Sequence, residues 1–195
     1  DGQLPDWSAA GLKARKDFLH QAIADAEGYK NLAKADAFER DYLVDVAKAD
    51  LFWLEDADQP HTDPAFYAGS LDPSVYVSRD YADGPTRMKA LTAFYDQVPG
   101  RAQEMIANLK TPLPASFVKN GIDAFDGYAE FYDHEALEAF SGVAAPEVQQ
   151  HLKYSAQKAS KAMRGVADWL RAQQASATQG FALGPERFSR MLQAT

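Results

Sequence analysis

Cysteine is absent from the 195 residues of this sequence, which excludes disulfide bonds and thiolate metal ligands. Long apolar runs are absent too, and none approaches the length of about 18 residues that a membrane-spanning helix needs. Positive charge is in deficit, because 20 Lys and Arg face 28 Asp and Glu for a net charge of -8. Such a net negative charge repels a phosphate backbone, so no nucleic-acid partner is expected. Because long apolar runs are missing, no transmembrane segment is expected either.

Strand patterns are scarce as well, since Val75-Tyr76-Val77 is a short exception and no longer run of β-branched residues alternates at period two. Apolar residues recur instead at steps of three and four, which is typical of helices. Six of the ten prolines stand where such a stripe begins: Pro64, Pro73, Pro85, Pro114, Pro146 and Pro185. Proline loses no hydrogen bond at the first helical position. We therefore predict an all-α fold, a multi-helix bundle or array that forms a single domain over residues 1–195.

The stripes predict successive helices, of which the first runs from a Ser8 cap to about Gly28. The second is expected over about residues 34–57, with its apolar face formed by Phe38, Tyr42, Val46, Ala49 and Phe52. Two further stripes meet at Pro99-Gly100, a pair that breaks helices, so a helical hairpin or a sharp kink is expected there. Helices are also expected over about residues 114–133, from 146 to about 179, and from 185 onward.

The predicted helix that begins at Pro146 carries a heptad-like seam with small residues in its middle. The seam consists of Val148, Leu152, Ser155, Ala159, Ala162, Val166 and Trp169. A neighbouring helix can approach closely there. The seam is either internal core, which ordinary bundles also use, or a surface for a partner helix.

An irregular aromatic connector, at about residues 60–84, interrupts the helical pattern. Asp63-Pro64 and Asp72-Pro73 each predict the start of a short helix, because Asp accepts hydrogen bonds from unpaired N–H groups at a helix start. Four rings, those of Phe66, Tyr67, Tyr76 and Tyr81, lie in the same stretch. The connector either lines a groove or fills the bundle with its rings.

No catalytic motif is present. His134-Glu135-Ala136-Leu137-Glu138 has Glu where a zinc-binding His-Glu-x-x-His helix has its second His, so a solvated acidic helix start is favoured over a metal site. The acidic stripe of Asp123, Asp126, Glu130 and Asp133 lies beside the apolar one, which favours a water-facing surface over an acid-base pair. Nucleophile elbows and phosphate-binding glycine loops are also absent.

Several local phrases resemble the first half of the bacterial family known as domain of unknown function 885. They are Asp63-Pro64-Ala65-Phe66-Tyr67, Arg79-Asp80-Tyr81, Val98-Pro99 before Ala107-Asn108-Leu109, and Gly180-Phe181-Ala182-Leu183-Gly184 followed by Phe188. The resemblance implies a helical protein related to zinc-dependent peptidases, often exported or lipid-anchored in the bacterial envelope. Members are longer, and their His-Glu and Pro-Gly-His-His motifs lie in the later half, so the resemblance assigns no metal ligand to this chain.

The resemblance implies that the chain is the N-terminal scaffold portion of a longer two-part hydrolase. In that protein it forms one wall of a cleft for peptide-like substrates, while zinc binds in the other half. Tyr67, Tyr76 and Arg79 are the expected substrate-binding residues, with Arg79 pairing either with a substrate carboxylate or with an Asp of the fold. The alternative is a non-enzymatic interaction module that uses the seam from Val148 to Trp169. Cation binding by the acidic surface is a third, weaker hypothesis.

Overall fold

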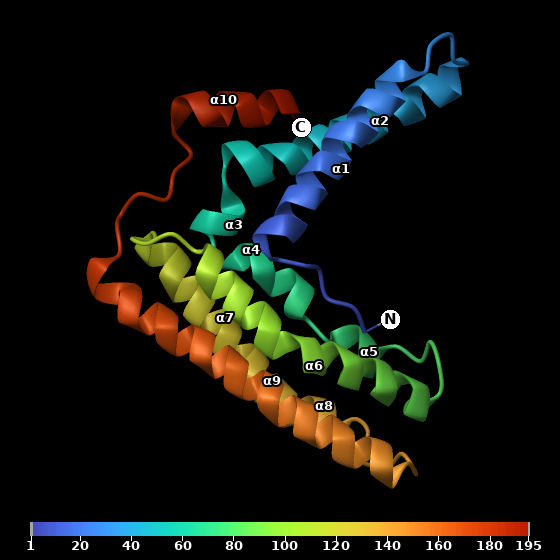
Figure 1. Cartoon of the computed structure of the whole chain (residues 1–195), viewed down its shortest axis with the longest axis vertical. Coiled ribbons are helices and arrows are strands. Elements are labelled where there is room, and N and C mark those ends of the chain that lie inside the picture. Colours follow the sequence, from blue (N-terminus) through green and yellow to red (C-terminus); the bar gives the residue numbers. More distant parts are fainter. Residues whose placement is uncertain (1, 195) are drawn as a thin grey trace.

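The computed structural model describes residues 2–194 and contains helices joined by short turns and loops. The α-helices are α1 (Ala9–Gly28), α2 (Lys34–Leu51), α3 (Gln59–Thr62), α4 (Ala65–Ala68), α5 (Ser74–Ser78), α6 (Gly84–Asn108), α7 (Ala115–Asp133), α8 (Glu135–Glu138), α9 (Pro146–Gln173) and α10 (Gly184–Ala194). Figure 1 shows a long bundle of α6, α7 and α9, from which the α1–α2 hairpin projects. The all-α prediction is confirmed; the one β-bridge in residues 2–194, Pro114 with Thr178, belongs to no strand.

Helix α9 is the helix of the bundle that packs along both α6 and α7. Its buried residues include Leu152, Ser155, Ala159 and Val166, four of the predicted seam positions. The stripe predicted for α7 is buried as well, over Val118, Ile122, Phe125, Ala129 and Tyr132. The seam is therefore internal core, and the alternative that offers it to a partner helix loses its proposed surface.

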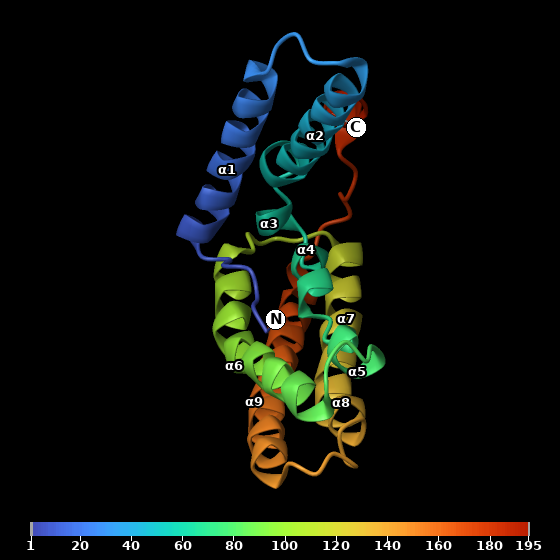
Figure 2. The same ribbon diagram turned by 90° about the vertical axis from the view of Figure 1, so that its right-hand side faces the viewer.

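Helix α6 runs through Pro99 without a break, so of the two alternatives predicted at Pro99-Gly100 the hairpin is wrong, and a kink within one helix is the alternative that remains. Proline removes one hydrogen bond of the helix. On the two sides of it, however, Tyr95, Val98 and Ala102 continue one buried stripe against the bundle. Burial of an apolar stripe outweighs the loss of one bond, and Figure 2 shows α6 as a single helix that changes direction along its length.

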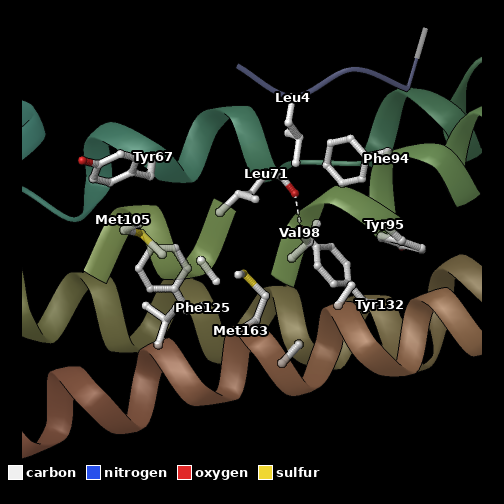
Figure 3. Packing of buried hydrophobic residues seen from close by; sticks show 14 of the residues in the cluster. Leu4, Tyr67, Leu71, Phe94, Tyr95, Val98, Met105, Phe125, Tyr132 and Met163 are labelled. Carbon is white, nitrogen blue, oxygen red and sulfur yellow. Dashed lines mark hydrogen bonds between the residues drawn. The ribbon is translucent and has the colours of Figure 1, made fainter. Parts of the chain in front are cut away.

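The connector lies along the bundle and contributes large side chains to its core. Tyr67 and Leu71 are fully buried, and Figure 3 shows them above α6, with Leu4 of the N-terminal segment alongside. Asp63 and Asp72 each accept a backbone hydrogen bond two residues on, from Ala65 and Ser74, over 2.9 and 2.8 Å. The two Asp-Pro pairs thus start α4 and α5 as predicted.

The α1–α2 hairpin is held by surface ion pairs and by few buried side chains. Ser8 caps α1 as predicted, accepting a hydrogen bond from the Gly11 backbone over 3.1 Å. Lys48 forms an ion pair with Glu27, and a ring nitrogen of His20 lies within hydrogen-bond distance of a Glu55 carboxylate oxygen, each over 3.1 Å. After Leu51, helix α2 continues into a π-helical turn, η1 (Phe52–Asp56), before the chain turns into the connector.

The apolar face predicted for α2 is largely wrong. Helix α2 buries Val44, Ala47 and Leu51, whereas Phe38 and Tyr42 are 71% and 62% exposed. Periodicity identifies an apolar stripe but not the element that covers it, and α1 covers only one side of α2. A second apolar face therefore points away from the hairpin.

Helix α10 contacts α2 and η1 at the base of the hairpin. Nε of Arg190 lies 2.8 Å from a carboxylate oxygen of Asp56. The helix buries none of its described residues; Phe188 and Leu192, two of its predicted apolar positions, are 50% and 61% exposed. Phe188 and Leu192 thus form a further apolar surface that is at least half exposed in residues 2–194.

Candidate functional site

Tyr67 and Tyr76, two of the predicted substrate-binding residues, are core residues. The Tyr67 hydroxyl donates to the Pro60 carbonyl over 2.6 Å and accepts from Nδ2 of Asn108 over 3.1 Å. The Tyr76 hydroxyl accepts from the Gly2 backbone over 3.0 Å. Burial raises the pKa of Tyr67 to about 12, so its hydroxyl is neutral at pH 7. In this conformation both rings hold the connector on the bundle, and neither is open to a ligand.

Arg79 is exposed at the end of α5, and no residue of the described chain forms an ion pair with it. The neighbouring Asp80 pairs over 2.8 Å with Arg87 instead. The Arg87 guanidinium also donates to the Arg79 carbonyl over 3.1 Å, which fixes the backbone there. The structure thus separates Arg79, on the surface, from the two buried tyrosines.

A groove of about 430 Å³ lies where the connector, the loop before α7 and the segment before α10 meet. Its apolar lining includes Trp53, Pro112, Phe117, Phe181 and Leu183. Its charged lining residues are Asp63, Lys110 and Arg187. The connector therefore does line a groove, but with Gln59, Thr62 and Asp63, not with its tyrosine rings.

Backbone hydrogen bonds hold the three walls of the groove together. The Lys110 N–H donates to the His61 carbonyl over 2.8 Å, which ties the loop to the connector. The Thr178 N–H donates to the Leu113 carbonyl over 2.9 Å, and the Ala115 N–H donates to the Thr178 carbonyl over 2.8 Å. Because main-chain groups make these bonds, the walls are positioned independently of the side chains that line them.

Charge in the groove is unevenly satisfied. The Lys110 ammonium lies 3.2 Å from Asp58, whose other carboxylate oxygen lies 2.5 Å from Nδ1 of His61. Burial raises the pKa of Asp63, although the Ala65 N–H that bonds it acts in the opposite direction. Arg187 is exposed on the first turn of α10 and has no ion-pair partner within residues 2–194. Arg187 is therefore the cation that is free to bind an anionic group.

Metal ligands are not grouped in the part of the chain that the structure describes, where no three His, Cys, Asp or Glu side chains come together. Two acidic residues of the α7 stripe form ion pairs with α9: Asp126 pairs with Arg171, and Asp133 lies 2.6 Å from Arg164. The exposed His134 precedes α8, and its carbonyl accepts the Glu138 N–H over 3.0 Å.

Sequence reasoning missed the main residues of the groove. Trp53 lies in the π-helical turn, Phe117 on the first turn of α7, and Arg187 on α10. Periodicity identifies positions on one helix, whereas the groove exists because three distant segments pair. One signal was available: the phrase from Gly180 to Gly184, quoted for its family resemblance, forms part of the groove wall.

Comparison with known proteins identifies the family and the fold. The family model described as "Bacterial protein of unknown function (DUF885)" matches residues 1–195. No curated protein matches the chain. Among solved structures, a protein from Shewanella oneidensis that is described as a candidate lipoprotein of unknown function matches with a TM-score of 0.78 and 16% sequence identity. The match covers 89% of this chain and 32% of that protein, and at this identity it shows the fold alone.

Proposed function

Because this chain belongs to the DUF885 family of bacterial proteins, we propose that it is the helical scaffold of a zinc-dependent hydrolase with peptide-like substrates. On this proposal the chain forms one wall of the substrate cleft, and the remainder of the parent polypeptide supplies the zinc ion and the general base. The chain spans about a third of the related Shewanella structure, since the match covers 32% of that protein.

The observation that carries the proposal is a pair of exposed apolar surfaces, one on α2 and one on α10. Phe38 and Tyr42 on α2, with Phe188 and Leu192 on α10, are at least half exposed. Burial of a large apolar side chain contributes about 1.5–3 kcal/mol, so faces of this kind favour contact with more polypeptide. We propose that the remainder of the parent polypeptide packs on these apolar surfaces, and that the groove stays uncovered and forms part of the substrate cleft.

The alternative function is a non-enzymatic interaction module. Because the seam on α9 is internal core, such a module would bind its partner through the exposed apolar surfaces of α2 and α10. Arg79 stays a proposed substrate contact because its guanidinium is exposed and matches a carboxylate. Tyr67 and Tyr76 are proposed to support that site by fixing the connector.

We propose the bacterial envelope as the location of the protein, because the Shewanella neighbour is described as a lipoprotein. None of the described helices is long and apolar enough to cross a bilayer.

The test is a reconstitution. The chain and the separately produced remainder of its parent are mixed, with zinc or with a chelator, and peptide hydrolysis is measured. We expect zinc-dependent hydrolysis by the mixture and little by either part alone, with a further loss on Arg79→Ala. Full activity of the remainder alone, or an inactive zinc-loaded mixture, would contradict the scaffold role. Stable association without any hydrolysis would favour the interaction module.

A further inference from the structure

The wall of the groove that precedes α10 is a stretch of backbone without regular secondary structure. Residues 180–183 form neither helix nor strand, and a bend at Gln179 separates them from the isolated bridge at Thr178. Bridge pairing ends at Thr178 within the described chain, so the main-chain groups beyond it are not held by a neighbouring strand. Main-chain groups that no neighbouring strand holds are able to bond to the main chain of a peptide ligand.

The side chains around this stretch divide the groove into an apolar part and a cationic end. Trp53 and Phe117 are half-buried, so each has ring surface left for a ligand. Arg187 is one turn into α10 and lines the same groove without an ion-pair partner in the described residues. Of the other two charged lining groups, Lys110 is already paired with Asp58, and Asp63 accepts the Ala65 N–H.

We infer that this groove binds the C-terminal end of a peptide: the main chain lies along residues 180–183, an apolar side chain packs on Trp53 and Phe117, and the terminal carboxylate pairs with Arg187. The inference rests on the proposed function and names the substrate class of its cleft. A guanidinium binds a carboxylate through two parallel hydrogen bonds, which distinguishes a free C-terminus from an amide. Asp63, in the opposite wall, disfavours a second ligand carboxylate there.

The experiment measures binding to the isolated chain by calorimetric titration, with no zinc and no turnover. The probes are N-acetyl-Ala-Phe with a free carboxylate and the same dipeptide as its carboxamide. We expect the carboxylate to bind about tenfold more tightly than the amide, the effect of one charge-assisted contact. Equal binding of the two probes, or no binding of either, would overturn the inference while leaving the reconstitution test of the scaffold role unaffected.

Variants assign the binding to residues. Arg187→Gln removes the guanidinium from an exposed position, and we expect it to abolish the preference for the carboxylate. Lys119→Gln is the matched control, because Lys119 is exposed on α7, pairs within residues 2–194 only with Asp123 and lies outside the groove. It changes the net charge equally and should change nothing. A preference that survives Arg187→Gln, or that Lys119→Gln abolishes to the same extent, would show nonspecific charge attraction and overturn the inference.

Two further measurements test whether the apolar part of the groove contributes to binding and whether the groove is free in the parent protein. Phe117→Ala is expected to weaken both probes alike, with folding verified by circular dichroism. The titration is then repeated on the parent protein. Retained binding is expected for a ligand groove, whereas binding by the isolated chain but not by the parent would show that the groove is filled by another part of the polypeptide, contrary to the inference.

Discussion

Tyr67 connects the connector to helix α6, because its hydroxyl donates to the Pro60 carbonyl over 2.6 Å while Nδ2 of Asn108 donates to it over 3.1 Å. The same Asn108 amide donates to the Trp7 carbonyl over 2.8 Å. One buried phenol thus fixes the connector and shares a partner with the N-terminal segment. The groove depends on this arrangement, since its connector wall begins immediately before Pro60.

Tyr67→Phe should therefore destabilise the chain by about 1–3 kcal/mol, because it leaves a buried carbonyl and an amide N–H without their partner. Chemical denaturation measures the loss. Tyr154→Phe is the control: Tyr154 is exposed on α9 and its hydroxyl forms no hydrogen bond within residues 2–194, so a change within about 0.5 kcal/mol is expected. Equal effects of the two variants would contradict the role of Tyr67.

Ala159→Leu should cost about 1–3 kcal/mol of stability, because Ala159 is fully buried where α9 packs on its neighbours and has no room for a larger side chain. The control on the same helix is Gln157→Leu at an exposed position, which should leave unfolding almost unchanged. If the seam were instead a surface for a partner, Ala159→Leu would leave the stability of the chain intact and alter only its association.

Asp63→Asn is expected to stabilise the chain at pH 7. Burial raises the pKa of Asp63, so the folded state binds the proton more tightly than the unfolded state and the ionised form costs stability. The asparagine oxygen still accepts the Ala65 N–H. The advantage of the variant should disappear as the pH falls below about 4, where the carboxyl is protonated in both states. Thermal unfolding at a series of pH values measures it.

Asp83→Asn serves as the comparison of opposite sign. Hydrogen bonds from the side chain and backbone of Thr86 lower the pKa of Asp83, so its charged form stabilises the start of α6 above the unfolded pKa. The Asp83→Asn variant should be less stable than the unsubstituted chain at pH 7. This difference in stability should vanish as the pH falls through the pKa that Asp83 has in the folded state. Shifts of the same sign for both variants would contradict these assignments.

Phe38→Ser, in the isolated chain, should change the free energy of unfolding by no more than about 0.5 kcal/mol, because the ring is mostly exposed. Val44→Ala, on the buried side of the same helix, should cost about 1–3 kcal/mol. The order is expected to reverse for binding to the remainder of the parent protein, where Phe38→Ser should weaken association more. A large loss of stability on Phe38→Ser would show that this face is already covered.

Much of the fold could be predicted from the sequence because its determinants are local. Prolines at helix starts, the Ser8 cap and the α7 stripe act within a few residues, and each has the structure that its pattern indicates. Pro99 is the instructive exception. Proline usually interrupts a helix, but burial of Tyr95, Val98 and Ala102 on one stripe favours a continuous α6.

The candidate site could not be predicted in the same way, because its residues meet only through tertiary pairing. Nothing local to Trp53, Phe117 or Arg187 indicates that the Thr178 backbone bonds to Leu113 and draws the three together. The exposed rings on α2 have a related cause. A pattern of apolar residues predicts that a face prefers burial, and no element within residues 2–194 covers Phe38 and Tyr42.

The absence of cysteine makes the scaffold claim directly measurable, since a single introduced thiol labels one position. Tyr42→Cys and, as a control away from both apolar faces, Lys119→Cys are each labelled in the isolated chain and after addition of the remainder of the parent, with any thiols of that part blocked beforehand. We predict that the remainder slows labelling at position 42 at least about tenfold and leaves position 119 unchanged. Equal labelling rates at position 42, with and without a remainder that binds, would contradict the account.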